Sequence, residues 1–293
     1  MKRLIVLLAL CGCFCVSGAA FAAHSHYTNG IEGIKAATFP PKGFYWRMYN
    51  AYYTANKYKN NQGKKSGSFN ADVYALANRF IYNTGMDVLG ADYAFDIVIP
   101  LQNTNIRMGG AFNKDKFGLG DILVEPVILA WHGDRWDAVV AGGVYIPTGY
   151  YKETNAASPG KGFWSFMGTA GGTLYFDAEK SWHASVLARY EIHTKQEDTH
   201  ITPGNDFHFE WGAGKTFAGL YDVGVAGYCA WQTTEDSGSG SSKYKEQAYA
   251  VGPEIGAAIP ALGMQVSLRS VWEFENRNAA QGNITTLTLT KAF

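Results

Sequence analysis

The last ten residues of the chain, 284–293, alternate between two kinds of side chain. Leu287 and Leu289 fall on one face and threonines fall on the other, before the chain ends at Phe293. This period of two predicts a β-strand, because successive side chains of a strand point to opposite faces. A strand that closes a membrane barrel accounts for the pattern, with leucine facing lipid, hydroxyls facing the lumen and an aromatic ring at the interface. The alternative is an edge strand of a soluble β domain.

The first 22 residues have the organisation of a secretory signal peptide. A basic start, Met1–Arg3, precedes the apolar run Leu4–Val16, and Ala20–Ala22 supplies a small-x-small cleavage site. The apolar run is too short to anchor the chain as a membrane helix. The segment Leu10–Cys13 resembles a lipoprotein signal, an alternative that the later Ala20–Ala22 site disfavours.

The composition of the remaining chain narrows its class. Cys229 is its single cysteine, so it forms no intramolecular disulfide, and we expect this side chain to face lipid. Without Lys2 and Arg3 the chain carries 23 basic against 25 acidic residues, which argues against a nucleic-acid partner. Over the full sequence, charged residues make up 17% and aromatic residues 15%. Since no later run of about 18 apolar residues predicts a membrane helix, the candidates are a secreted β domain and an outer-membrane barrel.

Segments with a period of two recur along the chain, and the connections between them alternate in length. Short connections such as 132–134, 177–180 and 218–219 alternate with long polar ones such as 148–163 and 234–245. The expected strands are 43–53, 71–83, 91–100, 118–131, 135–147, 164–176, 181–193, 205–217, 220–233, 246–259, 263–275 and 284–293. The sequence therefore predicts an all-β, transmembrane, antiparallel up-and-down β-barrel of about 12 strands, with short periplasmic turns and long extracellular loops.

The domain organisation follows from this pattern. We expect a signal peptide at 1–22, a periplasmic N-terminal segment at 23–42 and the barrel at 43–293, in the outer membrane of a Gram-negative-type cell. The N-terminal segment is expected to enter the lumen in part, because its apolar residues need cover. We also expect the segments 54–70, 101–117, 194–204 and 276–283 to be long connections.

Two prolines lie inside expected strands. Pro126 and Pro253 each remove a hydrogen-bond donor from the ladder, so we expect them at bulges or strand ends.

The expected partners of the chain are outer-membrane lipid, a small-molecule solute and the barrel-assembly machinery, which would bind the strand ending at Phe293.

Several motifs together resemble a known family. They are His26–Gly33, Phe39–Tyr45, and Gly118–Asp121 followed by Pro126. With the terminal Phe293, these segments resemble the meta-pathway of phenol degradation family of outer-membrane proteins, over essentially the whole mature chain. The resemblance implies a channel or transporter-type barrel that handles aromatic and other hydrophobic compounds, and it implies no catalytic residue. Lys291 departs from the large apolar residue usual at that place in the family.

Charged residues of both signs fall on the inward faces of the expected strands. They could form a constriction that sets the choice of solute, or they could be ion pairs that fill a narrow lumen. A one-sided excess of basic residues, as an anion-selective pore would show, is not present. The lumen-lining candidates are Arg47, Arg79, Asp92, Asp96, Glu125, Arg189, Glu191, Glu210, Glu254, Arg269 and Glu273.

Catalysis is the main functional alternative. The histidines are spaced in no metal-ligand motif, so we expect no metal site and no cofactor. Ser185 shares a face with His183, which leaves a barrel-wall lipid hydrolase as an alternative. No Gly-x-Ser-x-Gly elbow is present, so we expect no enzyme. The sequence favours a channel for small, hydrophobic or aromatic compounds, with the hydrolase and a non-transporting structural or adhesin barrel as alternatives.

Overall fold

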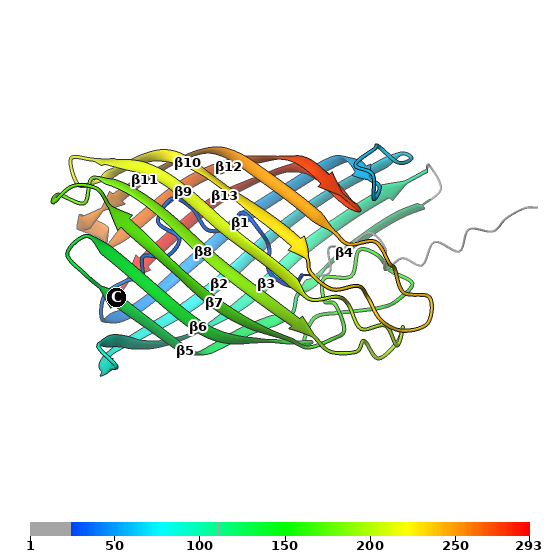
Figure 1. The fold of residues 1–293 in the computed structure, drawn as a ribbon, viewed down its shortest axis with the longest axis horizontal. Coiled ribbons are helices and arrows are strands. Elements are labelled where there is room, and N and C mark those ends of the chain that lie inside the picture. Colours follow the sequence, from blue (N-terminus) through cyan, green and yellow to red (C-terminus); the bar gives the residue numbers. More distant parts are fainter. Residues whose placement is uncertain (1–24, 110–111) are drawn as a thin grey trace, which may run out of the picture.

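The computed structural model describes residues 25–109 and 112–293, so the expected signal peptide lies outside the described residues. The described chain is built almost entirely from β-strands, with one short 3₁₀ turn, η2 (Pro260–Leu262) (Figure 1). The strands are β1 (Gly43–Lys59), β2 (Phe69–Val88), β3 (Ala91–Met108), β4 (Phe112–Leu119), β5 (Ile122–His132), β6 (Trp136–Ile146), β7 (Ser165–Tyr175), β8 (Trp182–His193), β9 (Asp206–Phe217), β10 (Tyr221–Gln232), β11 (Gln247–Ile259), β12 (Met264–Arg277) and β13 (Ala279–Ala292).

The sheet closes on itself as the sequence predicts. Consecutive strands pair antiparallel, and the closing strand β13 pairs with β1 from Tyr45 opposite Ala292 to Lys59 opposite Ala279. Strands β4 and β5 both pair with β3, so together they are one wall strand interrupted at 120–121. The wall therefore has twelve strands, and the predicted all-β antiparallel barrel is confirmed. Closure pairs the wall strands on both sides, as lipid requires, except that β4 pairs with β3 alone.

The strands extend further at one end than the sequence suggested. Three connections that we expected to be long loops contain paired strand: β1 continues to Lys59, β3 continues to Met108, and only Asn278 separates β12 from β13. The polar sequences of these hairpins look like loops, but their backbones keep the ladder pairing beyond the apolar part of the wall. The segments 147–164, 194–205 and 233–246 remain long loops at the same end, on the right in Figure 1.

The two prolines behave differently from one another. Pro126 lies at a bulge, because the register between β5 and β6 shifts between Val124 and Val127. For Pro253 the expectation is wrong: it lies within β11, and its register with β10 is continuous opposite Val225. On the other side of β11 the pairings with β12 are interrupted between Val251 and Glu254, and this gap accommodates the missing donor.

The two faces of the wall have opposite chemistry. Large apolar side chains are exposed on the outer face, among them Val186, Val223, Val225, Ile255, Leu268 and Trp272. Cys229 lies on the same face of β10 as Val223 and Val225, as expected. Among residues 25–109 and 112–293, no helix is long and apolar enough to cross a membrane. The inner face carries buried charged and hydroxyl side chains, which need partners inside the barrel.

The N-terminal segment supplies those partners. Residues 25–42, here called the plug, lie inside the barrel, where the blue segment crosses the interior in Figure 1. Ile34 and Ala37 of the plug are buried, and Ala37 packs with Ala94, Ile128 and Leu187 of the wall. The plug thus enters the barrel further than the partial insertion that the sequence suggested.

Candidate functional site in the barrel interior

The plug runs along the interior from the end with long loops to the end with short turns. Its first residues contact β7 and β8 near their loop ends, where Ser25 donates to Glu191. Lys35 then reaches Asp222, which lies at the short-turn end of β10. Near Gly43 the carbonyl of Pro40 accepts a hydrogen bond from Asn83. The wall therefore holds this segment through polar contacts along most of its length.

A cationic pocket holds Glu32 at the middle of the plug. Its carboxylate lies 3.5 Å from Nη1 of Arg47 and 3.3 Å from Nη1 of Arg79, and it accepts a 2.6 Å hydrogen bond from the hydroxyl of Tyr49. Burial acts to raise the pKa of Glu32, but Arg47 and Arg79 outweigh burial and hold that pKa below its usual 4.5. A lowered carboxyl pKa favours docking of the plug above about pH 4.5, and this contribution is lost as the pH falls through the lowered pKa.

Arg79 also joins the plug to two carboxylates of the wall. Its Nε lies 2.6 Å from Oδ2 of Asp96, and its Nη2 lies 3.0 Å from Oε2 of Glu125. Asp96 and Glu125 are 3% and 5% exposed, so neither charge is compensated by bulk water. The guanidinium group of Arg79 therefore forms ion pairs with three buried carboxylates, including that of Glu32.

Glu210 of β9 binds the plug backbone. Its Oε1 accepts hydrogen bonds of 2.9 Å from the amides of Gly30 and Glu32, and its Oε2 accepts one from the hydroxyl of Tyr27. Arg189 donates to the same carboxylate at 2.8 Å and lies 3.9 Å from the centre of the Tyr27 ring. This carboxylate thus recognises a turn of the plug through backbone donors rather than through a charged side chain.

Arg269 and Glu254 hold the next part of the plug in the same way. Arg269 donates to the carbonyls of Gly30 and Ile31 and to Glu254, while Glu254 accepts from the amide of Ile34 at 3.0 Å. A Cβ atom on Gly33 would lie 2.1 Å from a carboxylate oxygen of Glu254. A side chain at Gly33 would therefore displace the ends of the Glu254 and Arg269 side chains.

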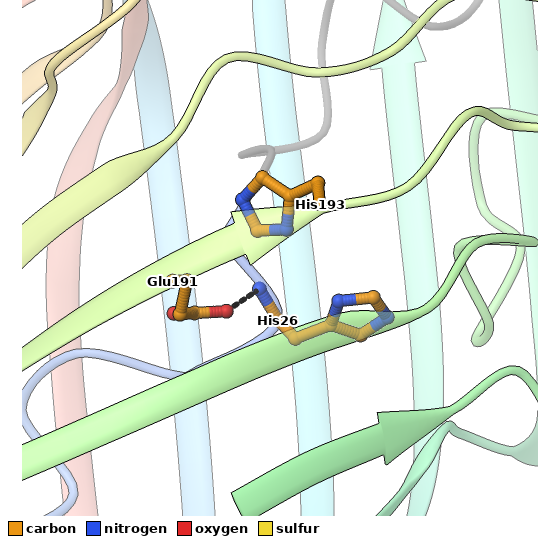
Figure 2. A group of neighbouring side chains, drawn as sticks. All are labelled: His26, Glu191 and His193. Carbon is orange, nitrogen blue, oxygen red and sulfur yellow. Dashed lines mark hydrogen bonds between the residues drawn. The ribbon is translucent and has the colours of Figure 1, made fainter.

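The head of the plug binds β7, β8 and the interrupted wall strand. His26 contacts Ser165 at 2.6 Å through Nδ1 and Asp121 at 2.9 Å through Nε2. The backbone amide of His26 donates to Glu191 at 2.9 Å, which Figure 2 shows as a dashed line. Asp121 also accepts from the amides of Gly149 and Lys161, so it ties the head of the plug to loop 147–164.

Nine of the eleven candidates from the sequence come together around the plug. They are Arg47, Arg79, Asp96, Glu125, Arg189, Glu191, Glu210, Glu254 and Arg269. The other two lie apart from this network. Asp92 accepts a hydrogen bond from Asn83, and Glu273 accepts from the hydroxyls of Tyr53 and Tyr228.

The residues that pair with these candidates were not identified from the sequence. Glu32, Asp121 and His26 belong to the family-like motifs, which were noted only as markers of resemblance. Their position in these short motifs was the available signal. Asp121 lies 95 residues from His26, and Glu254 lies 220 residues from Ile34, so no local pattern connects these pairs. Tyr49 lies only 17 residues from Glu32, but the two belong to different segments, the first strand and the plug.

The suggested Ser185–His183 dyad is not formed. Ser185 accepts a hydrogen bond from the amide of Ala37 at 3.0 Å and another from Thr173. Both ring nitrogens of His183 are buried, and neither has a hydrogen-bond partner among the described residues; Nε2 lies 3.9 Å from Oδ1 of Asp222. Ser185 therefore contacts the plug, and within the described part of the chain no histidine is hydrogen-bonded to it.

A cavity of about 510 Å³ lies between the head of the plug and the long loops. Apolar atoms make up most of the surface of this vestibule, although many of its lining residues are polar, among them Gln102, Lys161 and Glu273. The apolar lining residues include Tyr53, Tyr58, Phe69, Ile106, Tyr228 and Ile284. A second cavity, of about 100 Å³, lies beside the plug between Glu32 and β2 to β6.

Comparison with protein families matches residues 55–289 to the family described as "Putative MetA-pathway of phenol degradation". The chain belongs to this family. A comparison with curated protein sequences gives no significant match. The family match spans most of the barrel wall and begins after the plug.

Solved structures with the same fold include an outer-membrane channel from Pseudomonas putida F1. It is 12% identical, with a TM-score of 0.78, and the match covers 88% of this chain and 98% of that one. The transport unit of the autotransporter AIDA-I from Escherichia coli is also similar, with a TM-score of 0.50, 12% identity and coverage of 89% and 94%. At these identities the comparisons show the outer-membrane barrel fold of this family member.

Gly212 of β9 gives a direct test of how the plug is seated. A Cβ atom there would lie 2.6 Å from Cα of Ile34, and its nearest neighbours are all plug atoms. Gly212→Val should therefore force the plug away from the wall while leaving the strand ladder intact. We expect trypsin to cleave at Lys35 in the folded variant and not in the wild type. Gly168→Val is the matched control, because a Cβ at Gly168 meets nothing within 4 Å; equal cleavage of both variants would contradict this seating.

Proposed function

We propose that this family member is an outer-membrane channel that passes small hydrophobic or aromatic compounds. The observation that carries the proposal is the vestibule of about 510 Å³ at the loop end. Cavities of about 300–1,000 Å³ with mostly apolar walls are typical of sites that enclose small molecules. The description of the family and the name of the Pseudomonas putida channel agree with such a role.

The lining of the vestibule favours aromatic solutes over sugars. Tyr53, Phe69 and Tyr228 offer ring faces and edges, against which an aromatic ring packs in stacked or edge-to-face geometry. Most of the lining surface is apolar, and two of the tyrosine hydroxyls are already bonded to Glu273. An arene gains from contact with this mainly apolar surface, whereas a sugar must replace each hydrogen bond that it loses to water.

Passage beyond the vestibule requires the plug to move. The cavity beside the plug, at about 100 Å³, is much smaller than the vestibule. The plug would act as a gate. When it shifts, a path opens past the charged residues that hold it, and these residues would then select among solutes. Export by a cleaved signal peptide and assembly through the strand ending at Phe293 belong to the same proposal.

The proposal is tested by flux through the purified mature protein in liposomes, using a matched panel of aromatic acids, sugars and alkanes. We expect the aromatic compounds to enter faster than sugars of similar size. No flux for any compound, with no conductance in planar bilayers, would instead favour a structural or adhesin barrel. Turnover of phospholipid in detergent would favour a hydrolase.

A single substitution should test whether solutes pass through the vestibule. Ala230 lines the vestibule on β10, and Ala230→Trp would fill much of the space between Tyr228 and the opposite wall. We expect aromatic flux to fall severalfold and the barrel to stay folded. Cys229→Trp is the matched control, because the adjacent residue points to the lipid side; a similar loss of flux in both variants would show that the vestibule is not the route.

A further inference from the structure

The head of the plug brings together metal-ligating side chains from distant parts of the chain. Figure 2 shows His26 of the plug beside Glu191 and His193 of β8. One ring nitrogen of each histidine and one carboxylate oxygen of Glu191 all lie within 4.8 Å of one another. Glu191 and His193 are two residues apart on one strand, so they project from the same face toward the plug.

The outer hydrogen bonds fix which nitrogens can act as ligands. Nε2 of His26 lies 2.9 Å from Asp121, and Nε2 of His193 lies 3.0 Å from Asp206. A carboxylate only accepts, so each Nε2 carries the hydrogen and each Nδ1 of a neutral ring presents its lone pair. Carboxylates that bind the far nitrogen of a histidine are the usual outer partners of metal-ligating histidines.

The inner hydrogen bonds leave one acceptor without a proton. Nδ1 of His26 and Nδ1 of His193 both lie 2.6 Å from the same atom, Oγ of Ser165. A serine hydroxyl has one hydrogen and can donate to only one of the two rings. Both histidine side chains are nearly inaccessible, at 3% and 0% exposed, so water does not readily supply the missing donor.

The carboxylate of Glu191 is an anionic ligand with a lone pair that accepts no hydrogen bond from the described residues. Its Oε1 accepts from Ser25, the amide of Tyr27 and His208, and its Oε2 accepts only from the amide of His26 among the contacts that the described residues make. A second lone pair of Oε2 is therefore open. The carboxylates of Asp121 and Asp206 add negative charge around the site, and Lys161 is the neighbouring cation.

We infer that Nδ1 of His26, Nδ1 of His193 and the carboxylate of Glu191 bind a divalent transition-metal ion of the zinc class, which joins the plug to β8. Two imidazoles and one carboxylate suit zinc, with Oγ of Ser165 or a water as a fourth ligand. The three ligand atoms lie within 4.8 Å of one another, and zinc–nitrogen bonds of about 2.0–2.1 Å require them to move closer together on binding. The metal ion supplies the positive partner that a single serine proton cannot give to both rings.

Zinc binding is measured on the untagged full mature protein in detergent, after a chelator has removed bound metal. Titration against a chromophoric zinc chelator should give one zinc per chain. His193→Gln and Glu191→Gln should weaken binding by well over tenfold, whereas His200→Gln, in an exposed loop at the same end, should bind as the wild type does. Faster migration of unboiled samples on a gel shows that each variant is folded.

A second variant separates a metal ligand from a structural residue. Asp206 contacts His193 and not the proposed ion, so Asp206→Asn should weaken zinc binding by about 10–100-fold without changing the stoichiometry. Cobalt substitution should give the strong visible absorption of a four-coordinate site in the wild type and lose it in His193→Gln. Absence of zinc binding by the wild type, or equal binding by wild type and His193→Gln, overturns the inference. Neither readout depends on transport, so failure of the channel proposal is distinguishable from failure of this one.

Discussion

Deletion of residues 23–38 should convert the barrel into an open pore. The wall ladder does not depend on the plug, since β1 closes against β13 through pairings that begin at Tyr45. Water would replace the plug and hydrate the carboxylates of Glu210 and Glu254, so their charges would not be left in a dry interior. We expect single-channel conductance to rise on the order of tenfold or more, because a continuous aqueous path would then cross the membrane.

The control for this experiment restores the plug separately. A synthetic peptide of residues 23–38, added on the side of the short turns, should lower the conductance of the deleted barrel. A peptide with Gly33→Val should not, because a side chain at that position collides with Glu254 and Arg269. Unchanged conductance in the deletion would mean that another part of the barrel closes the path. Equal block by both peptides would mean that a plug need not occupy the observed position to block conductance.

The wall of the barrel was predictable because its rules are local. Alternation of Leu and Thr in the last strand sets the two faces, and Thr286 is indeed buried while Leu287 is exposed. Short connections such as 218–219 mark the turns of one end from residue type alone. The limits of prediction were also local: Asn278 and its neighbours are polar enough to be taken for a loop, yet they form a tight turn between paired strands.

For the interior, the sequence predicted which charged residues point inward but not which groups they contact. Inward positions of the strands identified most of the charged residues, because alternation places Glu210 and Arg269 on the polar face. It could not show that Glu210 binds the amide of Gly30, 180 residues away, or that Asp121 joins His26 to a loop. Such contacts depend on how a segment without regular structure passes through the barrel, and no periodicity encodes that path. The same reason hid the grouping of His26 with Glu191 and His193.

Arg79→Met should cause the largest loss of stability of any single substitution in the interior. It leaves Asp96 and Glu125, both almost fully buried, without their guanidinium partner, and it leaves Glu32 with Arg47 alone. Removal of one partner from a buried ion pair typically costs about 3–5 kcal/mol, because the remaining charge stays poorly solvated. We expect urea-induced unfolding in lipid vesicles to show a loss of this size.

The matched control uses an arginine in an exposed ion pair. Arg107 lies 3.0 Å from Asp72, but the two side chains are 55% and 32% exposed, so Arg107→Met should cost no more than about 1 kcal/mol. Adding Glu125→Gln to Arg79→Met should recover part of the lost stability, because the second change removes one of the uncompensated charges. If Arg79→Met and Arg107→Met cost the same, or if Glu125→Gln gives no recovery, the interior charges are solvated in the folded barrel. The plug would then be held mainly by its backbone contacts with Glu210 and Arg269.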